Sequence, residues 1–299
     1  MACPTWEGRT RPGKSPFVMG NAKATIVKAN ALIQAGYRLT LAEQRVLLAA
    51  IAQVRRDEEP TDQAMYSVTA SGLADITGTS AARSYQELAD AADRLYGRQV
   101  WIKGGANGEE KGKNGKRVTQ TGWVQQIDYI PDQGRVEMRF TYPILPYLTM
   151  LKSQFTSYQL EHVAGMKSTH GVRLYELLVQ WRQAGEREID VGEFRRMFGV
   201  DGRYPSIKDL KKRVLEPAVR DVNQSSDLTV TWGQRKAGRK VAAFQFVFEP
   251  KNRPKTTKSG RPRITRDVIE KYAEPGESYE QAKLRLEKKF LAKGDMFDD

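Results

Sequence analysis

The stretch DVGEFRRMFGVDGRYPSIKDLKKRVLEPAVRDVN, residues 190–223, holds two helical patterns that are separated by a turn. The first pattern is VGEFRRMFG (191–199), which Gly199 ends, and the second follows Ser206, a residue type favoured as a helix N-cap. The second pattern repeats apolar residues along one helical face: Ile207, Leu210, Val214, Ala218 and Val222. Two helices joined by a tight turn indicate a helix-turn-helix.

The sequence on either side of this stretch extends the motif. A helical pattern at 172–181 and a short strand at 188–190 precede it, and strand patterns at 228–232 and 241–248 follow it. The two later strands flank the basic loop GQRKAGRK (233–240). A helix-turn-helix followed by a β-hairpin with a cationic tip is the winged form of the motif, in which the second helix enters a major groove and the hairpin tip reaches the DNA backbone.

The first half of the chain repeats this order. A capping box, Thr40 with Glu43, opens a helix that ends before Asp57, and Gly78 separates two further helices. The remaining elements are a strand at 66–68, helices at 71–78 and 80–96, and strands at 99–103, 118–130 and 135–140, with the basic loop GGANGEEKGKNGKR at 104–117. In the helix at 80–96 we expect one buried stripe: Tyr85, Leu88, Ala92 and Leu95.

Because the same order occurs twice with a basic run in the same place, the sequence predicts an α+β fold of two tandem winged-helix domains with a basic C-terminal extension. We expect four parts. They are a disordered basic arm at 1–25, an N-terminal winged-helix domain for dimerisation and DNA contact at 26–148, a C-terminal winged-helix domain for the main DNA binding at 149–250, and a basic linker with an amphipathic helix at 251–299.

The composition limits the class of protein and of partner. The chain has 299 residues, a net charge of +13 and one cysteine, Cys3, so it forms no internal disulfide and no cysteine zinc cluster. No apolar run approaches the length of a membrane span and the N-terminus lacks the apolar core of a signal peptide, so we expect a cytoplasmic protein. The positive charge points to a polyanion, either nucleic acid or an acidic membrane surface.

Basic residues of the second half are the main candidates for DNA contact. Four side chains of the helix project away from its apolar stripe, toward phosphates or guanine edges: Lys208, Lys212, Arg213 and Arg220. Lys211 falls nearer the stripe, so its stem should lie along apolar surface, and Pro217 should kink the helix. The hairpin adds Arg235, Lys236, Arg239 and Lys240. The plain alternative is a solvated helix face, but the basic hairpin just downstream favours DNA.

The corresponding helix of the first half is polar rather than basic. Its expected exposed face carries Arg83, Ser84, Gln86, Glu87 and Asp90. Base-edge contact is open to Arg83, Ser84 and Gln86, but strong phosphate affinity is not implied. We therefore expect the C-terminal half to supply more of the binding energy.

The segment GRTRPGKS, residues 8–15, fits the pattern of a phosphate-binding loop but lacks its structural setting. Such a loop needs a buried strand before it and a helix at its end, and here Pro4 breaks the short preceding segment while Pro16 follows Ser15 directly. Pro12 also removes an N–H from the loop. A basic arm is the favoured interpretation, and an enzyme that uses this segment is the weakest of the possible functions.

No site for chemistry is evident elsewhere. The two histidines, His162 and His170, are too far apart in sequence to form the metal-binding pair of a rolling-circle nickase, and we interpret each as an ordinary polar residue. No carboxylate cluster has metal-binding spacing and no Ser/His/Asp set is visible. We expect no enzymatic activity, no cofactor and no metal.

From about Val27 to Phe248 the chain resembles the initiator proteins of theta-replicating, iteron-containing bacterial plasmids. The resemblance is carried by VKANALIQAGYRLTLAEQRVLLAAIAQV (27–54), SQFTSYQLEHVAGMKSTHGVRLYELLVQW (153–181), YPSIKDLKKRVLEPAVRDVN (204–223) and the hairpin that follows. None of these segments is a catalytic signature, and the specificity lies in their joint order and spacing.

The resemblance implies a function and a set of partners. Monomers would bind the direct repeats of the origin as double-stranded DNA, and dimers would repress the initiator's own gene. By position, Lys208, Lys211, Lys212 and Arg213 would lie on the recognition helix, with Arg235, Lys236, Arg239 and Lys240 on the wing. The implied protein partners are the host replication initiator, the replicative helicase, chaperones and a second copy of the chain, in a monomer–dimer equilibrium. A tandem winged-helix transcriptional regulator without origin-melting activity is the alternative.

Two segments leave more than one interpretation open. Leu32, Leu39 and Val46 lie seven residues apart like a zipper, but Gly36 interrupts them, so we interpret Leu39 and Val46 first as core residues and place dimerisation on surface strands or helices of the first domain. The tail beyond Lys251 holds a basic run and then an amphipathic helix that begins at Ser278. A partner helix and an extra DNA clamp are equally compatible with that tail.

The missing strand and helix around GRTRPGKS lead to the first prediction. Lys14→Ala should leave binding to origin repeats and initiation intact, apart from a small loss of charge. DNA-binding and ATPase assays on the variant check this, and ATP hydrolysis that the substitution abolishes would contradict it.

Overall fold

The computed structural model describes residues 23–59, 61–108, 118–251, 280–281 and 284–285. The chain divides into two compact units, Met1–Pro250 and Lys251–Asp299. The expected basic arm up to residue 22, most of the expected tail and the lysine-rich part of the first basic loop (109–117) lie outside the described residues. The division of the chain at 148 and 149 stays a prediction.

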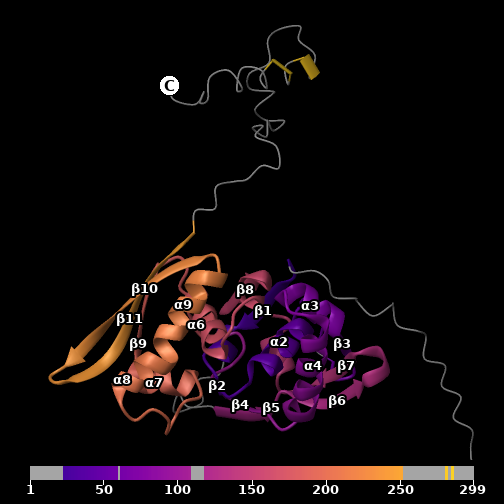
Figure 1. Ribbon diagram of the computed structural model, residues 1–299, viewed down its shortest axis with the longest axis horizontal. Helices are drawn as coiled ribbons and strands as arrows, with labels where there is room; N and C mark the ends of the chain where they lie inside the picture. The colour runs from indigo at the N-terminus through magenta and orange to yellow at the C-terminus, as the bar shows by residue number, and fades with distance from the viewer. Residues whose placement is uncertain (1–22, 60, 109–117, 252–279, 282–283, 286–299) are drawn as a thin grey trace, which may run out of the picture. The chain divides into compact units, whose positions relative to one another are not determined.

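The first unit holds all the elements expected for two winged helices, and several more (Figure 1). Its first part consists of β1 (Thr25–Ala29), α1 (Asn30–Ile33), β2 (Gly36–Tyr37), α2 (Leu41–Ile51), β3 (Tyr66–Thr69), α3 (Ala70–Thr77), α4 (Ala81–Leu95), β4 (Gln99–Lys103), β5 (Val118–Gly122), β6 (Val124–Ile130), η1 (Pro131–Gln133), β7 (Arg135–Phe140) and η2 (Leu145–Tyr147). Its second part consists of β8 (Phe155–Gln159), α5 (Glu161–Ala164), α6 (Thr169–Val179), β9 (Glu186–Asp190), α7 (Val191–Met197), α8 (Ile207–Leu210), η3 (Lys211–Leu215), α9 (Glu216–Ser225), β10 (Leu228–Ala237) and β11 (Lys240–Pro250).

The second winged helix has the expected order. Strand β9 is followed by α7, by the helix that runs through α8, η3 and α9, and by the hairpin β10–β11. The strands form an antiparallel sheet in the order β10-β11-β9, in which Phe244 of β11 lies opposite Gln234 on one side and Ile189 on the other. The winged-helix fold predicted from residues 190–248 is confirmed.

The first winged helix is also present, but its wing is not the hairpin that the sequence suggested. Strands β3, β7 and β6 form a sheet in the same relative order as β9, β11 and β10, so the wing is β6–β7 and its tip is η1 with Gly134. In Figure 1 this hairpin and β10–β11 lie at opposite ends of the unit.

The strands that flank the first basic loop belong to another sheet. Strand β4 pairs with β2 and β5 in a sheet of its own, and the expected single strand at 118–130 is divided by the fully buried Trp123 into β5 and β6. The expectation of a basic run in the same place of both halves is therefore wrong. Strand partners depend on distant parts of the chain, and local periodicity carries no information about them.

The buried stripe of α4 agrees with the expected one at Leu88 and Leu95 and differs by one position at the other two residues. Its buried residues are Ser84, Leu88, Ala91 and Leu95. Tyr85 is 44% exposed, and its ring lies over Gly134 at the wing tip, where an added Cβ would come within 2.4 Å of the ring. The tyrosine thus covers a glycine of the wing instead of entering the core.

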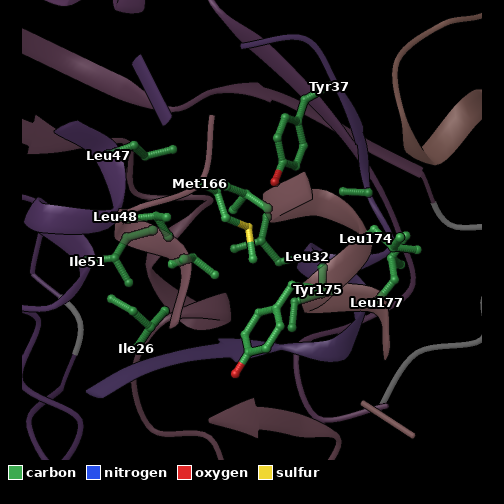
Figure 2. Packing of buried hydrophobic residues seen from close by; sticks show 14 of the residues in the cluster. Ile26, Leu32, Tyr37, Leu47, Leu48, Ile51, Met166, Leu174, Tyr175 and Leu177 are labelled. Atoms are coloured by element: carbon green, nitrogen blue, oxygen red, sulfur yellow. The ribbon is translucent and has the colours of Figure 1, made fainter. Parts of the chain in front are cut away.

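One hydrophobic core continues across both winged helices. Strand β1 pairs with β8, so the start of the first part is held in a two-stranded sheet with the start of the second. Figure 2 shows side chains of β1, α1, α2 and α6 directed toward one another around Met166. Val46 lies in this core and Leu39 packs against it, which confirms their interpretation as core residues, and Leu32 is buried there as well.

The helix that carries the candidate DNA-binding residues accommodates Pro217 through a wider turn. The segment η3 is π-helical, and the N–H of Glu216 bonds to the carbonyl of Lys211, five residues back. Proline has no N–H and its ring crowds the preceding turn, so an inserted π turn relieves the clash without ending the helix. The sequence predicted a kink at Pro217, and what the structure has is this π turn just before the proline.

A cluster of buried charges joins the elements at the centre of the unit. The carboxylate of Glu176 on α6 accepts from Lys28 Nζ of β1 at 2.6 Å, from Arg173 at 3.2 Å and from the hydroxyl of Tyr158 on β8. Lys28, Arg173 and Glu176 are at most 3% exposed. Three ionised groups without access to water are stable only as a set.

Arg173 extends this cluster to three further elements. Its guanidinium donates to the hydroxyl of Tyr37 on β2 at 2.6 Å and to the carbonyl oxygens of Ile33, Ala35 and Met197 at 2.8–3.0 Å. Burial alone would raise the pKa of Glu176, but the charges of Lys28 and Arg173 and the hydrogen bonds from Lys28 and Tyr158 together hold it below its usual value. The carboxylate therefore stays ionised at neutral pH.

Within the described residues, no helix has the length and apolar character needed to cross a membrane.

Glu176→Gln should destabilise the fold by about 3–5 kcal/mol, because it leaves Lys28 and Arg173 buried without their shared counter-charge. Urea denaturation of the variant and the wild type measures this difference. The matched control is Glu249→Gln, at an exposed position of β11, which should change the free energy of unfolding by less than about 0.5 kcal/mol. Equal losses in the two variants would contradict the central role of the cluster.

Candidate nucleic-acid interface

The second helix of the C-terminal helix-turn-helix presents a basic face. Lys208, Lys212, Arg213 and Arg220 are all exposed, and the opposite face of the helix is buried through Leu210, Val214, Leu215, Ala218 and Val222. This is the division that the helical spacing predicted. The exposed cations have the reach and the donors to meet phosphates or base edges of a duplex.

Lys211 lies at the border of the two faces, as expected. It is half-buried, and its Nζ lies 3.3 Å from Gln234 Oε1 and 6.0 Å from the centre of the Trp232 ring. Its amine therefore joins the helix to β10. This contact makes it a link between the recognition helix and the wing.

The helix is fixed to the body of the domain by a buried carboxylate. Asp221 accepts from the backbone N–H groups of Lys167 and Ser168 at 2.8–2.9 Å and from the Ser168 hydroxyl. Gly171 leaves room for this contact, since a Cβ there would lie 2.4 Å from Asp221 Oδ2. Helix α9 is thus held at the start of α6.

The turn before the helix is held by an arginine that the sequence did not single out. Arg195 of α7 donates to the carbonyl oxygens of Arg203 at 2.6 Å, of Tyr204 at 2.8 Å and of Pro205 at 3.4 Å. Tyr204 has a φ of 51°, a backbone conformation that needs such support in a residue with a side chain. Every residue has a backbone carbonyl, so the sequence pattern does not show which carbonyls an arginine will bind, and the role of Arg195 could not be predicted from it.

The second basic segment is a regular hairpin and not a loop. Strand β10 runs to Ala237 and β11 begins at Lys240, so Gly238, with a φ of 60°, and Arg239 alone make the turn. A bulge lies between Arg235 and Lys236. Lys236, Arg239 and Lys240 are exposed at or beside the tip, where a wing would meet a DNA backbone.

Arg235 differs from the other wing cations because it is already paired. Its guanidinium donates to Glu188 Oε1 at 2.8–2.9 Å and lies 3.6 Å from Asp190 Oδ1, both on β9. Gln245 of β11 donates to the other oxygen of Glu188 at 3.0 Å. The pKa of Glu188 is therefore lowered, first by the hydrogen bond from Arg235 and then by that from Gln245.

The candidate residues of α4 are more neutral, and one of them is misplaced. Ser84 is fully buried and its hydroxyl lies 2.9 Å from that of Thr79, so the expectation that it faces DNA is wrong. Arg83 is exposed but pairs with Glu87 at 3.0 Å, and Gln86 is exposed and donates to Asp90 at 2.8 Å. The expected contrast between a polar α4 and a basic C-terminal helix is thus present in the structure.

Other candidate groups lie outside the described residues or take structural roles. Lys14 and the rest of GRTRPGKS, and the basic run from Arg253 to Arg263, are outside the described residues. His170 packs against Phe198, and burial lowers its pKa. Among the described residues, no three His, Cys, Asp or Glu side chains gather where they could hold a metal ion.

Comparison with known proteins identifies the fold and its relatives. The family described as "Initiator Replication protein, WH1" matches residues 25–179, and that described as "Initiator Rep protein, WH2" matches residues 190–248. A replication initiation protein of Escherichia coli is 28% identical over 235 residues, which span 76% of this chain and 70% of that protein. The PI protein of Escherichia coli is 23% identical over 254 residues, 76% of this chain and 83% of that protein.

A solved structure has the same arrangement of elements. The crystal structure of Pi initiator protein in complex with iteron DNA covers 78% of this chain and 100% of that chain, with 22% identity and a TM-score of 0.65. At that identity the likeness supports the fold.

The paired wing arginine gives a prediction that an NMR titration of side-chain carboxyls can check. In the wild type Glu188 should titrate below its ordinary pKa of about 4.5, and in Arg235→Ala it should return toward that value, because its strongest hydrogen bond is lost. Lys236→Ala removes the same charge from the next residue and should leave the Glu188 titration close to that of the wild type. An unchanged titration in Arg235→Ala would show that the pair is absent in solution.

Proposed function

Because the chain belongs to the family of replication initiator proteins that contain the winged-helix domains WH1 and WH2, we propose that it initiates plasmid replication by binding iterons, the direct repeats of an origin. The observation that supports this most is the exposed basic face of the α8–α9 helix beside a wing whose tip is also basic. The related Pi protein was solved with iteron DNA, in the same fold.

In the proposed complex the two winged helices share one face of the duplex. The α8–α9 helix lies in a major groove, with Lys208, Lys212 and Arg213 at base edges and phosphates, while Lys236, Arg239 and Lys240 of the wing reach the backbone. Helix α4 enters a neighbouring groove through Arg83 and Gln86. Since groove centres on one face are about 10 bp apart, the protected site spans about 20 bp.

The binding energy of this complex comes mainly from the second winged helix. Phosphate contacts by lysine and arginine supply most of the affinity of such proteins, and the free cations of the described residues gather on the C-terminal helix and wing rather than on α4. Arg220 and Lys211 take part at the edges of that surface. The role proposed for α4 is contact with bases, where its amide and guanidinium act as hydrogen-bond donors.

We further propose the partners that this activity requires. The monomer recruits the host replication initiator and the replicative helicase, and a homodimer represses the initiator's own gene, with chaperones acting on the equilibrium between the two. Within the described residues β5 has a neighbour on one side only, β4, which makes its other edge a place for dimerisation through the first winged helix.

Action on plasmid DNA places the protein in the cytoplasm, and the proposal requires neither enzymatic activity nor a cofactor.

An origin test separates this function from that of a plain transcriptional regulator. A plasmid that carries about two-turn direct repeats beside an AT-rich stretch should replicate only when the protein is supplied. A protein that protects an operator from cleavage but never supports replication would be a regulator, and the proposal of initiation would be wrong.

Lys212→Ala should weaken binding to the repeat by about 1–3 kcal/mol and relax the base preference at one position if its amine contacts a base. If the amine contacts only a phosphate, the loss should be uniform across sequences and the salt slope should fall by about one. Titrations of the intact protein with repeat and random duplexes at several salt concentrations distinguish these results.

The matched control for Lys212 is Lys152→Ala. Lys152 is exposed and carries the same charge, but it lies between η2 and β8, outside the recognition helix and the wing. Equal losses in the two variants would mean that only net charge matters, which contradicts a specific interface on the α8–α9 helix.

A further inference from the structure

An arginine of the first winged-helix part reaches the turn of the C-terminal helix-turn-helix. Arg38, directly after β2, donates through Nε to the carbonyl oxygen of Gly199 and through a terminal nitrogen to that of Asp201 at 3.0 Å. Gly199 ends α7, and Asp201 lies in the turn that leads to Ser206 and the α8–α9 helix. The Arg38 side chain thus connects the end of β2, in the first part, to the turn that precedes the α8–α9 helix.

The backbone segments around β2 and around the end of α7 lie in close contact where Arg38 meets the turn. Gly199 has a φ of 61°, and a Cβ there would lie 2.3 Å from the carbonyl oxygen of Tyr37 and 2.8 Å from Arg38 Cγ. On the other side a Cβ on Gly36 would lie 3.3 Å from the carbonyl oxygen of Arg196, whose guanidinium donates to Gln34 O at 3.1 Å. The two backbones thus lie in close contact, and at Gly199 only glycine fits.

The far end of the same turn is held from within the second winged helix. Arg195 binds the carbonyls of residues 203–205, so the turn has one arginine at each end and these come from different parts of the chain. Arg195 fixes the turn to its own domain, whereas Arg38 fixes it to β2. Both arginines thus contact the turn from which the α8–α9 helix starts.

We propose that Arg38 is a positioning residue for DNA recognition, which sets the orientation of the α8–α9 helix from the first winged-helix part without touching the DNA. This inference rests on the proposed function. Both bonds of the guanidinium point at backbone carbonyls, which leaves the phosphate and base contacts to the helix and wing. An open cleft of about 620 Å³ beside it, lined by Arg38, Gly199 and Asp201 among others, allows the side chain to leave without repacking the core.

The alternative role for an exposed arginine near this turn is a phosphate contact, and lysine separates the two. A lysine keeps the charge, so a phosphate contact would survive Arg38→Lys. Its three N–H donors all sit on one flexible nitrogen, so it cannot reproduce the rigid pair of donors, Nε and a terminal nitrogen, with which Arg38 holds Gly199 O and Asp201 O. Arg38→Lys should therefore resemble Arg38→Ala if the residue positions the turn, and resemble the wild type if it binds phosphate.

The first arm of the experiment measures the affinity of the intact protein for repeat and random duplexes at several salt concentrations. We expect Arg38→Ala and Arg38→Lys both to lower the affinity for the repeat by about tenfold, with the affinity for random DNA and the salt slope unchanged. The control is Arg56→Ala, an exposed arginine that donates to the carbonyl of Thr25 within the first part, and it should leave the preference for the repeat unchanged.

The second arm needs no DNA. Amide hydrogen exchange of the free protein should be faster at residues 200–206 in both Arg38 variants and unchanged in α4. Unchanged exchange in the turn, wild-type affinity in Arg38→Ala, or an Arg38→Lys variant with wild-type affinity would each overturn the proposal. If the wild type binds no repeat at all, the proposed function fails, whereas faster exchange would still support the bond between Arg38 and the turn.

Discussion

The ionised carboxylate of Glu176 is the constraint on which the rest of the structure depends. It neutralises Lys28 of β1 and Arg173 of α6 at a point without solvent, and Arg173 in turn satisfies carbonyls at the end of α1, before β2 and at the end of α7. A buried charge without its partners is costly, so these elements keep one arrangement or lose the whole set of contacts. The two winged helices are consequently joined by a rigid polar centre as well as by apolar packing.

That centre explains why the helix-turn-helix is held from both parts of the chain. Met197, which accepts from Arg173, lies two residues before Gly199, which accepts from Arg38, and both contacts fix the end of α7. Strand β1 also pairs with β8, so a cut near residue 150 would separate two paired strands and divide the buried charges. The arrangement of the second winged helix is therefore a property of the intact unit.

The sequence predicted what local physics determines and missed what depends on distant partners. The capping box at Thr40, the αL glycines that end α3 and α7, and the apolar stripe from Leu210 to Val222 all follow from short-range patterns, and the structure has each of them. The wing of the first domain was misassigned because β3, the strand before the helix-turn-helix, pairs with β7, which is more than 60 residues away, and not with the hairpin β4–β5 that flanks the basic loop. The roles of Arg38 and Arg195 were missed for a related reason. Both donate to backbone carbonyl oxygens, which every residue has, so no pattern of side chains in the sequence marks the acceptors.

The distribution of free and paired cations gives the interface its balance of affinity and specificity. Affinity for phosphate grows with every unpaired lysine or arginine, on random DNA as much as on a specific site. On α4 the charge of Arg83 is offset by Glu87, and on the wing that of Arg235 is offset by Glu188, so both surfaces attract random DNA less than their arginine content suggests. The α8–α9 helix keeps Lys208, Lys212 and Arg213 exposed, so in the proposed complex the attraction is concentrated on the helix assigned to the bases. In the proposed complex these acidic partners would limit non-specific binding, while the arginines still stabilise the fold through their hydrogen bonds.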